Sequence, residues 1–181
     1  NIKIYKIMTN YPLKTSDYSL QYGALLGVIS VVFALMLFFL DQHYQGGTAV
    51  NVVNTVIMVS VIVLGQYAYK KANSNYLSLA EGLKIGLGIS LISALISVAY
   101  YFILVNFLDP DTMEKALLLA QDKMIEVNPK LTQKELDDIA EISRKFSGPG
   151  VTSTFILIFN LFFGFIISLI SGLIIKKSKP E

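Results

Sequence analysis

The sequence contains no cysteine, a single histidine and few charged residues. The absence of cysteine from all 181 residues excludes disulfides, thiol nucleophiles, iron–sulfur clusters and zinc sites built from thiolates. Charged residues make up 15% of the chain, whereas ordinary soluble domains carry about 25%. The apolar share of 54% and the mean hydropathy of +0.58 indicate a protein that lies in a membrane. The net charge is only +2 and the basic residues are scattered, so we expect no nucleic-acid partner.

Four apolar stretches are long enough to cross a bilayer, which takes roughly 20 residues of helix. They lie at about 18–40, 50–69, 77–107 and 151–175, and none has a charge in its central part. The first follows several lysines, as a signal peptide would, but no small-residue cleavage site comes after it, so we expect a retained helix. We therefore predict an all-α fold, an integral membrane four-helix bundle that forms a single membrane domain over residues 1–181.

The lysines in and beside the short loops predict the orientation. They gather on one predicted side: Lys3, Lys6, Lys14, Lys70, Lys71, Lys84, Lys176, Lys177 and Lys179. The segment 109–148, on the other side, holds six basic and nine acidic residues. Because short loops rich in lysine and arginine stay in the cytoplasm, we predict a multi-pass membrane protein with both termini cytoplasmic.

The segment between the third and fourth spans has the pattern of two short helices. Asp109 before Pro110 resembles an N-cap followed by a proline at the first helical position, and apolar residues then recur at helical spacing over 110–127. Thr132 and Glu135 form the pattern of a capping box for a second helix. We predict an extracytoplasmic helical hairpin over about 109–148, with one face of each helix in need of cover.

The string ISLIS occurs twice, at 89–93 and at 167–171, within longer strings that match at eight of eleven positions. Small or polar residues recur around it at steps of four, which places them on nearly one helix face. They are Gly82, Gly86, Ser90 and Ala94 in the third span, Asn160, Gly164, Ser168 and Gly172 in the fourth, and Gly23 and Gly27 in the first. Small residues allow helix backbones to approach closely in a bilayer. We predict helix-packing faces, with a solute-lining face as the alternative.

Polar residues inside the spans are few. Asn51 and Asn54 lie near the outer end of the second span, Gln66 lies near its inner end, and Asn160 lies deeper in the fourth. A hydrogen bond to a neighbouring helix is the plain interpretation of such amides, and lining a solute path is the alternative. The middle of each span lacks every acidic, basic and histidine residue, so we expect no proton-coupled transport, voltage sensing or intramembrane proteolysis.

Candidate catalytic and metal-binding groups lie outside the spans. His43 is the only histidine, and we expect a solvated loop residue rather than a catalyst. Asp109, Asp111 and Glu114 could hold Mg²⁺ near a lipid-linked phosphate, but acids in the first turn of a helix are explained equally well by the helix dipole. We therefore predict no catalytic, cofactor-binding or metal-binding residue, no cofactor, and no enzymatic activity.

Several strings together resemble a known family. They are EGLKIGLGISLISALIS, FLDP at Asp109 and Pro110, a helical insert, and FSGPG before a last span rich in glycine and serine. Over about 18–177 the chain resembles a bacterial family of small four-helix integral membrane proteins catalogued as a domain of unknown function. The resemblance implies a bacterial cytoplasmic membrane protein with four spans, and it brings no catalytic residues.

Two functions fit these observations. The first is a non-enzymatic accessory or structural subunit that packs through its small-residue faces and docks a partner through the hairpin. The second is a small carrier or channel for a solute or lipid, with a path lined by Asn51, Asn54 and Asn160. Four helices alone enclose little volume, so the second function predicts an oligomer. The expected partners are membrane lipids and either further copies of the chain or other membrane protein subunits.

Overall fold

The computed structural model describes residues 13–178, which form six α-helices and one π-helical turn. In chain order these are α2 (Thr15–Phe39), α3 (Thr48–Ala72), α4 (Leu79–Ile103), the π-helical turn η1 (Leu104–Leu108), α5 (Thr112–Val127), α6 (Gln133–Phe146) and α7 (Pro149–Ile175). Three lysines used for the predicted orientation, Lys3, Lys6 and Lys179, lie outside the described residues.

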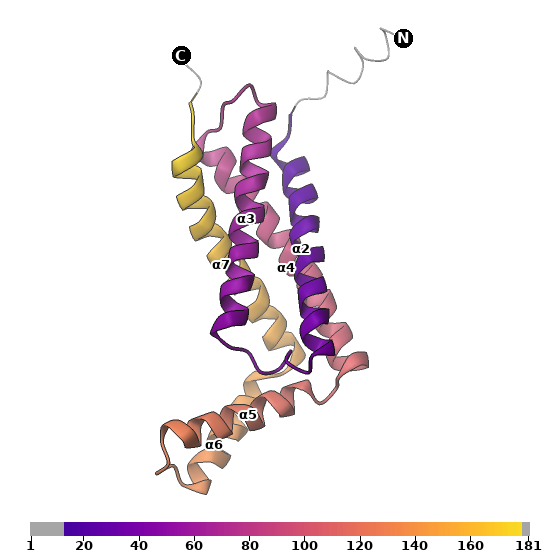
Figure 1. The fold of residues 1–181 in the computed structure, drawn as a ribbon, viewed down its shortest axis with the longest axis vertical. Helices are drawn as coiled ribbons and strands as arrows, with labels where there is room; N and C mark the ends of the chain where they lie inside the picture. The colour runs from indigo at the N-terminus through magenta and orange to yellow at the C-terminus, as the bar shows by residue number, and fades with distance from the viewer. Residues whose placement is uncertain (1–12, 179–181) are drawn as a thin grey trace.

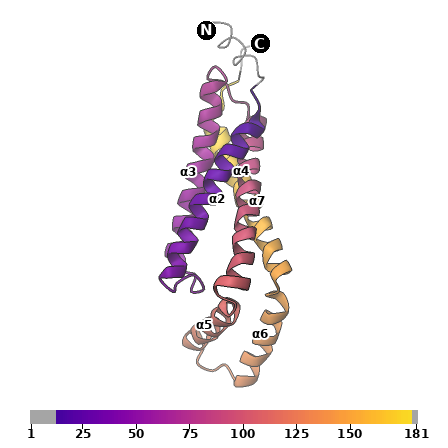
Figure 2. The ribbon, with the colours of Figure 1, turned by 90° about the vertical axis from the view of Figure 1, so that its right-hand side faces the viewer.

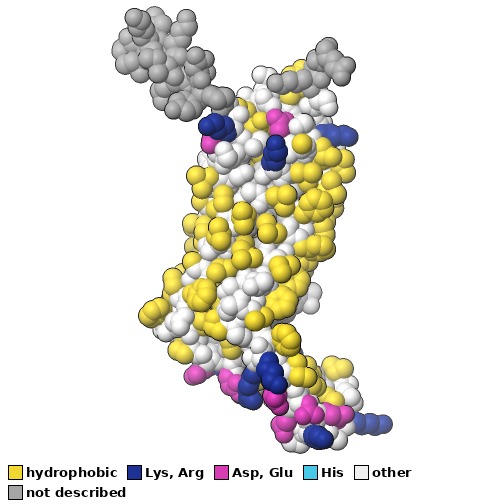
Figure 3. All heavy atoms as spheres, turned by 180° about the vertical axis from the view of Figure 1, so that it is seen from behind, with side chains coloured by type: hydrophobic (Ala, Val, Ile, Leu, Met, Phe, Trp, Pro, Cys, Tyr) yellow, Lys and Arg dark blue, Asp and Glu magenta, His cyan; other side chains and the backbone are white. Residues whose placement is uncertain are grey.

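Four of these helices, α2, α3, α4 with η1, and α7, are long and apolar enough to cross a membrane. Their apolar side chains point mostly outward: even in α4, the most enclosed of the four, only 33% of the most apolar window is buried. On the face drawn in Figure 3 these side chains form a band across the bundle, and the lysines, arginines and carboxylates lie toward its two ends. Such a surface fits lipid and would be unstable in water, so the predicted all-helical membrane fold is confirmed.

The four long helices form an antiparallel bundle with α4 at its centre (Figure 1). α4 packs along α2 and α7, while α3 contacts all three of the others. The start of α2 and the end of α7 lie together at one end, called here the terminal end. The short helices α5 and α6 lie at the other, called the hairpin end. Figure 2 shows that α3 and α7 lie close together at the terminal end and diverge toward the hairpin end.

The apolar core lies in the half of the bundle nearer the terminal end. Its buried members are Leu26, Val61, Ile62, Tyr69, Leu77, Ile85 and Ile89. α4 begins here with a complete capping box, in which the Ser78 hydroxyl accepts from the Glu81 amide and the Glu81 carboxylate accepts from the Ser78 amide. This cap satisfies free amides at the start of the central helix and fixes the direction in which α4 enters the bundle.

The two ISLIS strings lie at the contact between α4 and α7, in a reciprocal arrangement. Gly86 lies against the side chain of Ser168, and Gly164 lies against the side chain of Ser90. Both serines are fully buried, and each hydroxyl donates to the carbonyl of the glycine four residues earlier in its own helix. Each serine therefore fills the space left by a glycine on the other helix, so the two backbones approach closely without an unpaired hydroxyl.

The other small residues of the predicted stripes lie at further contacts. Gly23 and Gly27 of α2 lie against isoleucines of α4, and Gly82 lies against Gly172. Gln66 of α3 is fully buried beside that pair, and its side-chain amide donates to the carbonyls of Gly82 and Ser168. Ala94 is also fully buried. Gln66 thus joins three helices through one side chain, which confirms for this residue the prediction of a hydrogen bond to a neighbouring helix.

The junction between the third span and the hairpin differs from the prediction. The N-cap of α5 is Asp111, not Asp109, and it makes no side-chain capping bond. The reason is the π-helical turn, in which the Asp109 amide donates to the carbonyl of Leu104 over 2.8 Å. This wider turn, with a further turn over 109–112, delays the start of α5 to Thr112 and leaves the Asp109 carboxylate available for contacts elsewhere.

The predicted helical hairpin is present as α5 and α6. The capping box of Thr132 and Glu135 opens α6 as predicted. Leu136 and Ala140 are the buried residues of α6, and an ion pair of 2.8 Å between Arg144 and Glu114 joins the two helices. The side of the membrane on which the hairpin lies stays a prediction.

Candidate functional site

A cavity of about 780 Å³ lies among the four long helices in the half nearer the hairpin end. It exists because α3 is packed along only part of its length. All buried residues of α3 lie between Val61 and Tyr69, whereas its first half, from Thr48 to Ser60, has none. The divergence of α3 from α7 in Figure 2 follows this division. A single chain therefore forms a half-open cavity large enough for a small ligand, and the expectation that a carrier would be an oligomer stays a prediction.

The cavity wall carries no charge and presents more apolar than polar surface. Eight of its fifteen lining residues are polar, and all four helices contribute: Ser30, Asn51, Asn54, Thr55, Ser93, Ser97, Tyr100 and Asn160. The apolar remainder includes Phe159 and Phe163, whose rings stack on each other. A wall of hydroxyls and amides between apolar surfaces suits a ligand that is uncharged, partly apolar and able to form hydrogen bonds.

Several polar groups on this wall have hydrogen-bonding capacity to spare. The Tyr100 hydroxyl is buried and has no hydrogen-bond partner among the described residues. The side-chain amides of Asn51 and Asn54 likewise make no hydrogen bond within residues 13–178. The Asn160 amide donates to the carbonyl of Ile156 over 2.8 Å, which leaves its own side-chain oxygen without a partner in the same part of the chain. Buried polar groups are nearly always paired, so the Tyr100 hydroxyl is a candidate partner for a water or another molecule in the cavity, as are the exposed amides of Asn51 and Asn54.

The structure brings Asn51, Asn54 and Asn160 together on the wall of this one cavity. Asn160 is half-buried and bonds to its own helix, so the interpretation as a bond to a neighbouring helix is wrong for this residue. Sequence reasoning missed Ser93, Ser97 and Tyr100 as members of the wall. Their spacing of four and three residues places them on one face of α4. This spacing begins at Ser93, the last residue of the first ISLIS string, and could have indicated a polar face.

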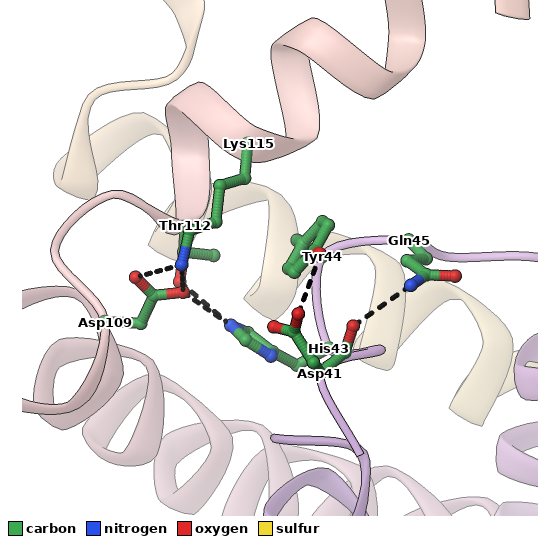
Figure 4. Close-up of polar contacts among 7 residues, drawn as sticks. All are labelled: Asp41, His43, Tyr44, Gln45, Asp109, Thr112 and Lys115. Carbon is green, nitrogen blue, oxygen red and sulfur yellow. Dashed lines mark hydrogen bonds and ion pairs between the residues drawn. The ribbon is translucent and has the colours of Figure 1, made fainter. Parts of the chain in front are cut away.

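A cluster of four polar residues joins the two connections at the hairpin end (Figure 4). It consists of His43, Asp109, Thr112 and Lys115, and is called here the His43 cluster. His43 Nε2 lies 2.9 Å from Asp109 Oδ2 and 3.2 Å from Thr112 Oγ1, while Lys115 Nζ lies within 2.9 Å of both carboxylate oxygens. An ionised carboxylate can only accept, so the proton of the contact with Asp109 resides on His43 Nε2.

The expectation that His43 is a solvated loop residue is wrong. Only 5% of its side chain is exposed, and the rings of Phe38 and Tyr44 pack against the imidazole. The loop between α2 and α3 therefore folds back onto the turn before α5, although 66 residues separate His43 from Asp109. This contact fixes the loop that leads into the loosely packed half of α3.

The electrostatics of the cluster are set by Asp109. The hydrogen bond from the Lys115 ammonium, together with the bonds from His43 and Thr112, lowers the pKa of the Asp109 carboxyl to about 2 against the opposing effect of burial. The same contact raises the pKa of Lys115. Asp109 is therefore ionised at any physiological pH, and the cluster is held by a charge-assisted bond in a largely dry site.

The three acids considered as a metal or catalytic group are not brought together. Asp109 is buried in the His43 cluster, Asp111 is exposed, and Glu114 is engaged by Arg144 on α6. Among residues 13–178 no group of three or more histidine or acidic residues is arranged to hold a metal ion.

The comparison with protein families agrees with this architecture. Residues 21–177 match the family described as "Protein of unknown function (DUF4199)". The chain belongs to this family. The DUF4199 match begins inside α2 and ends just beyond α7, so the cavity and the His43 cluster both lie within it. The chain matches no curated protein and no solved structure.

Proposed function

We propose that this DUF4199 protein is a non-enzymatic membrane protein that binds an uncharged amphiphilic molecule, such as a lipid with a hydroxylated headgroup, in the cavity among its four long helices. The observation that carries the proposal is the orphaned Tyr100 hydroxyl on a wall that three asparagines share. The volume of about 780 Å³ lies within the range of about 300–1,000 Å³ that is usual for small-molecule pockets.

The polarity of the wall argues for the class of ligand. A charged headgroup would be desolvated in the cavity with no opposite charge on the wall to compensate for the loss of water. Hydroxyl, ester and amide groups can pair with Asn51, Asn54 and Tyr100, and an alkyl chain can pack on Phe159 and Phe163. A monoacylglycerol combines these features and serves as a probe.

Binding of a monoacylglycerol to the purified full chain, followed by native mass spectrometry, tests the proposal. We expect Asn54→Leu and Asn160→Leu to weaken binding by up to about tenfold each, because each removes hydrogen bonds to the ligand. Asn106→Leu is the matched control, since Asn106 lies in η1 outside the cavity. Equal affinity in all three variants, or no saturable binding to the wild type, would overturn the proposal.

The proposed orientation is the one predicted from the lysines, and the proposed membrane is the one that the family resemblance implies. We infer that the terminal end faces the cytoplasm of a bacterial inner membrane and the hairpin lies on the other side. In support, every described lysine outside the segment 109–148 lies at the terminal end: Lys14, Lys70, Lys71, Lys84, Lys176 and Lys177. The segment 109–148 itself holds more acidic than basic residues. A carrier would also move its ligand across the membrane. Ligand flux into liposomes that is lost in Asn160→Leu, while this variant still folds normally, would identify a carrier.

An accessory role for the hairpin is the second candidate. Its short helices leave apolar side chains uncovered, among them Leu118 at 53%, Ile125 at 42% and Phe146 at 64% exposed. A partner subunit or a second copy of the chain could cover them. Purification in mild detergent at native expression level, with native mass spectrometry, would show a stoichiometric companion that Leu118→Ser with Ile125→Ser releases. An unaccompanied monomer in the wild type would overturn this role and leave the cavity as the functional site.

A further inference from the structure

A second, smaller cleft of about 200 Å³ lies at the terminal end, where α3 and α7 finish. It is lined by Tyr67, Lys70, Lys71, Asn75 and Lys177. This volume is below the range of about 300–1,000 Å³ that is usual for a whole small-molecule ligand. The cleft therefore fits a single ionic group, with the rest of any ligand lying outside it.

Two of the three lysines of this cleft, Lys70 and Lys177, are held by contacts within the fold. The Lys70 ammonium donates to the carbonyl of Ile175 over 2.7 Å, which uses one of its three donors and leaves two. Lys177 forms an antiparallel bridge with Leu77, through backbone hydrogen bonds of 3.0 and 2.9 Å, and its ammonium lies 5.5 Å from the ring centre of Tyr76. The chain thus brings together lysines that are more than 100 positions apart.

No carboxylate of residues 13–178 forms an ion pair with the lysines of the cleft. The sequence contains no acidic residue between Asp41 and Glu81, and none between Glu141 and Glu181. The carboxylate of Glu81 is engaged by the Tyr69 hydroxyl and by Ser78. All ion pairs among the described residues lie at the hairpin end, so the ammonium groups of Lys70, Lys71 and Lys177 have no carboxylate partner in the part of the chain that is described.

The surroundings of the cleft indicate a lipid. Leu64, Tyr67 and Lys71 are three and four positions apart on α3, so they share one helix face. Leu64 is 55% exposed and Tyr67 is 60% exposed, and both lie on the membrane side of Lys71. We propose that the cleft binds the phosphate of an anionic phospholipid, with Lys70, Lys71, Lys177 and the Asn75 amide around its oxygens and an acyl chain along Leu64. Lysine binds phosphate as a compact point charge at the level where headgroups lie.

Native mass spectrometry of the full chain, with phosphatidylglycerol or phosphatidylcholine added to the detergent, tests this site. We expect one phosphatidylglycerol to be retained per chain in preference to phosphatidylcholine. The double variant Lys71→Gln with Lys177→Gln should weaken that binding by about twentyfold, since each lysine near a lipid surface contributes on the order of a fivefold affinity gain. Both lysines are exposed, so the double variant should unfold at the wild-type temperature.

The matched control is Lys14→Gln with Lys84→Gln, which removes the same charge from the same end of the bundle but outside the cleft. This control should keep its phosphatidylglycerol. Equal loss from both double variants would show only a general attraction of lysines to anionic membranes and would overturn the site. Displacement of the lipid by millimolar inorganic phosphate would reassign the cleft to small anions, and that outcome also overturns the proposal.

Discussion

Ser168 lies directly against Gly86, and its side chain occupies the space that a methyl group on Gly86 would need. The same relationship joins Ser90 to Gly164 in the opposite direction along the contact. We expect Gly86→Ala and Gly164→Ala each to lower the free energy of unfolding by about 1–3 kcal/mol, because an added carbon in a fully packed contact forces the helices apart. Thermal unfolding in detergent, followed by circular dichroism, measures the effect.

The control for this prediction is Gly150→Ala. Gly150 lies in the first turn of α7 with open space around it, so alanine should leave stability unchanged or raise it by up to about 1 kcal/mol through its better helix propensity. If the three alanine variants were equally stable, the close contact between α4 and α7 would be wrong.

The Asp109 carboxylate should make stability depend on pH at the acid end. Its pKa is lowered from 3.8 to about 2, so the ionised form stabilises the fold fully above about pH 4 and progressively less as the pH falls toward 2. The shift corresponds to roughly 2 kcal/mol. Asp109→Asn should lose this part of the free energy of unfolding already at pH 7. Its free energy of unfolding should also change less between pH 5 and 2 than that of the wild type. Asp111→Asn, an exposed neighbour, should retain the wild-type profile.

Tyr100→Phe separates a ligand-binding role from a structural one. The hydroxyl is buried without a partner among the described residues, so its removal should leave the unfolding temperature of ligand-free protein unchanged or higher. Monoacylglycerol affinity should fall by about three- to tenfold if the hydroxyl bonds to the ligand. An unchanged affinity would remove Tyr100 from the binding site. A marked loss of stability would show that the hydroxyl has a structural partner.

The orientation can be tested by labelling, since the chain has no native cysteine. Ser74→Cys reports on the connection between α3 and α4, and Val127→Cys, at a side chain that is 87% exposed, reports on the tip of the hairpin. In intact cells we expect a membrane-impermeant maleimide to label residue 127 alone, and residue 74 to react only after the membrane is opened. Labelling of both from outside would contradict the antiparallel arrangement of four spans.

The four spans and the capping box of Thr132 were predictable because each depends on residues that are close in sequence. Hydropathy over roughly 20 residues identifies a membrane helix, and a capping box is complete within four positions. The position of the asparagines on one cavity wall depends on how far α3 diverges from α7, and no local pattern encodes that divergence.

The His43 cluster was not predictable for the same reason. Nothing in the residues next to His43 indicates that its partner is Asp109, and the π-helical turn that frees Asp109 from capping α5 has no signature in the sequence. A lone histidine in a short loop is usually solvated, which is why the sequence predicts a solvated His43. The rings of Phe38 and Tyr44 instead pack against it.

Partial packing of α3 divides the bundle into a fixed half and an adaptable half. Gln66 and its neighbours hold the last turns of α3 to α4 and α7, whereas the first turns meet no buried contact of their own. If the cavity binds a ligand as we propose, a small tilt of α3 about Gln66 would change the width of the cavity while the apolar core stays packed. The proposed site would then accept ligands with chains of different length.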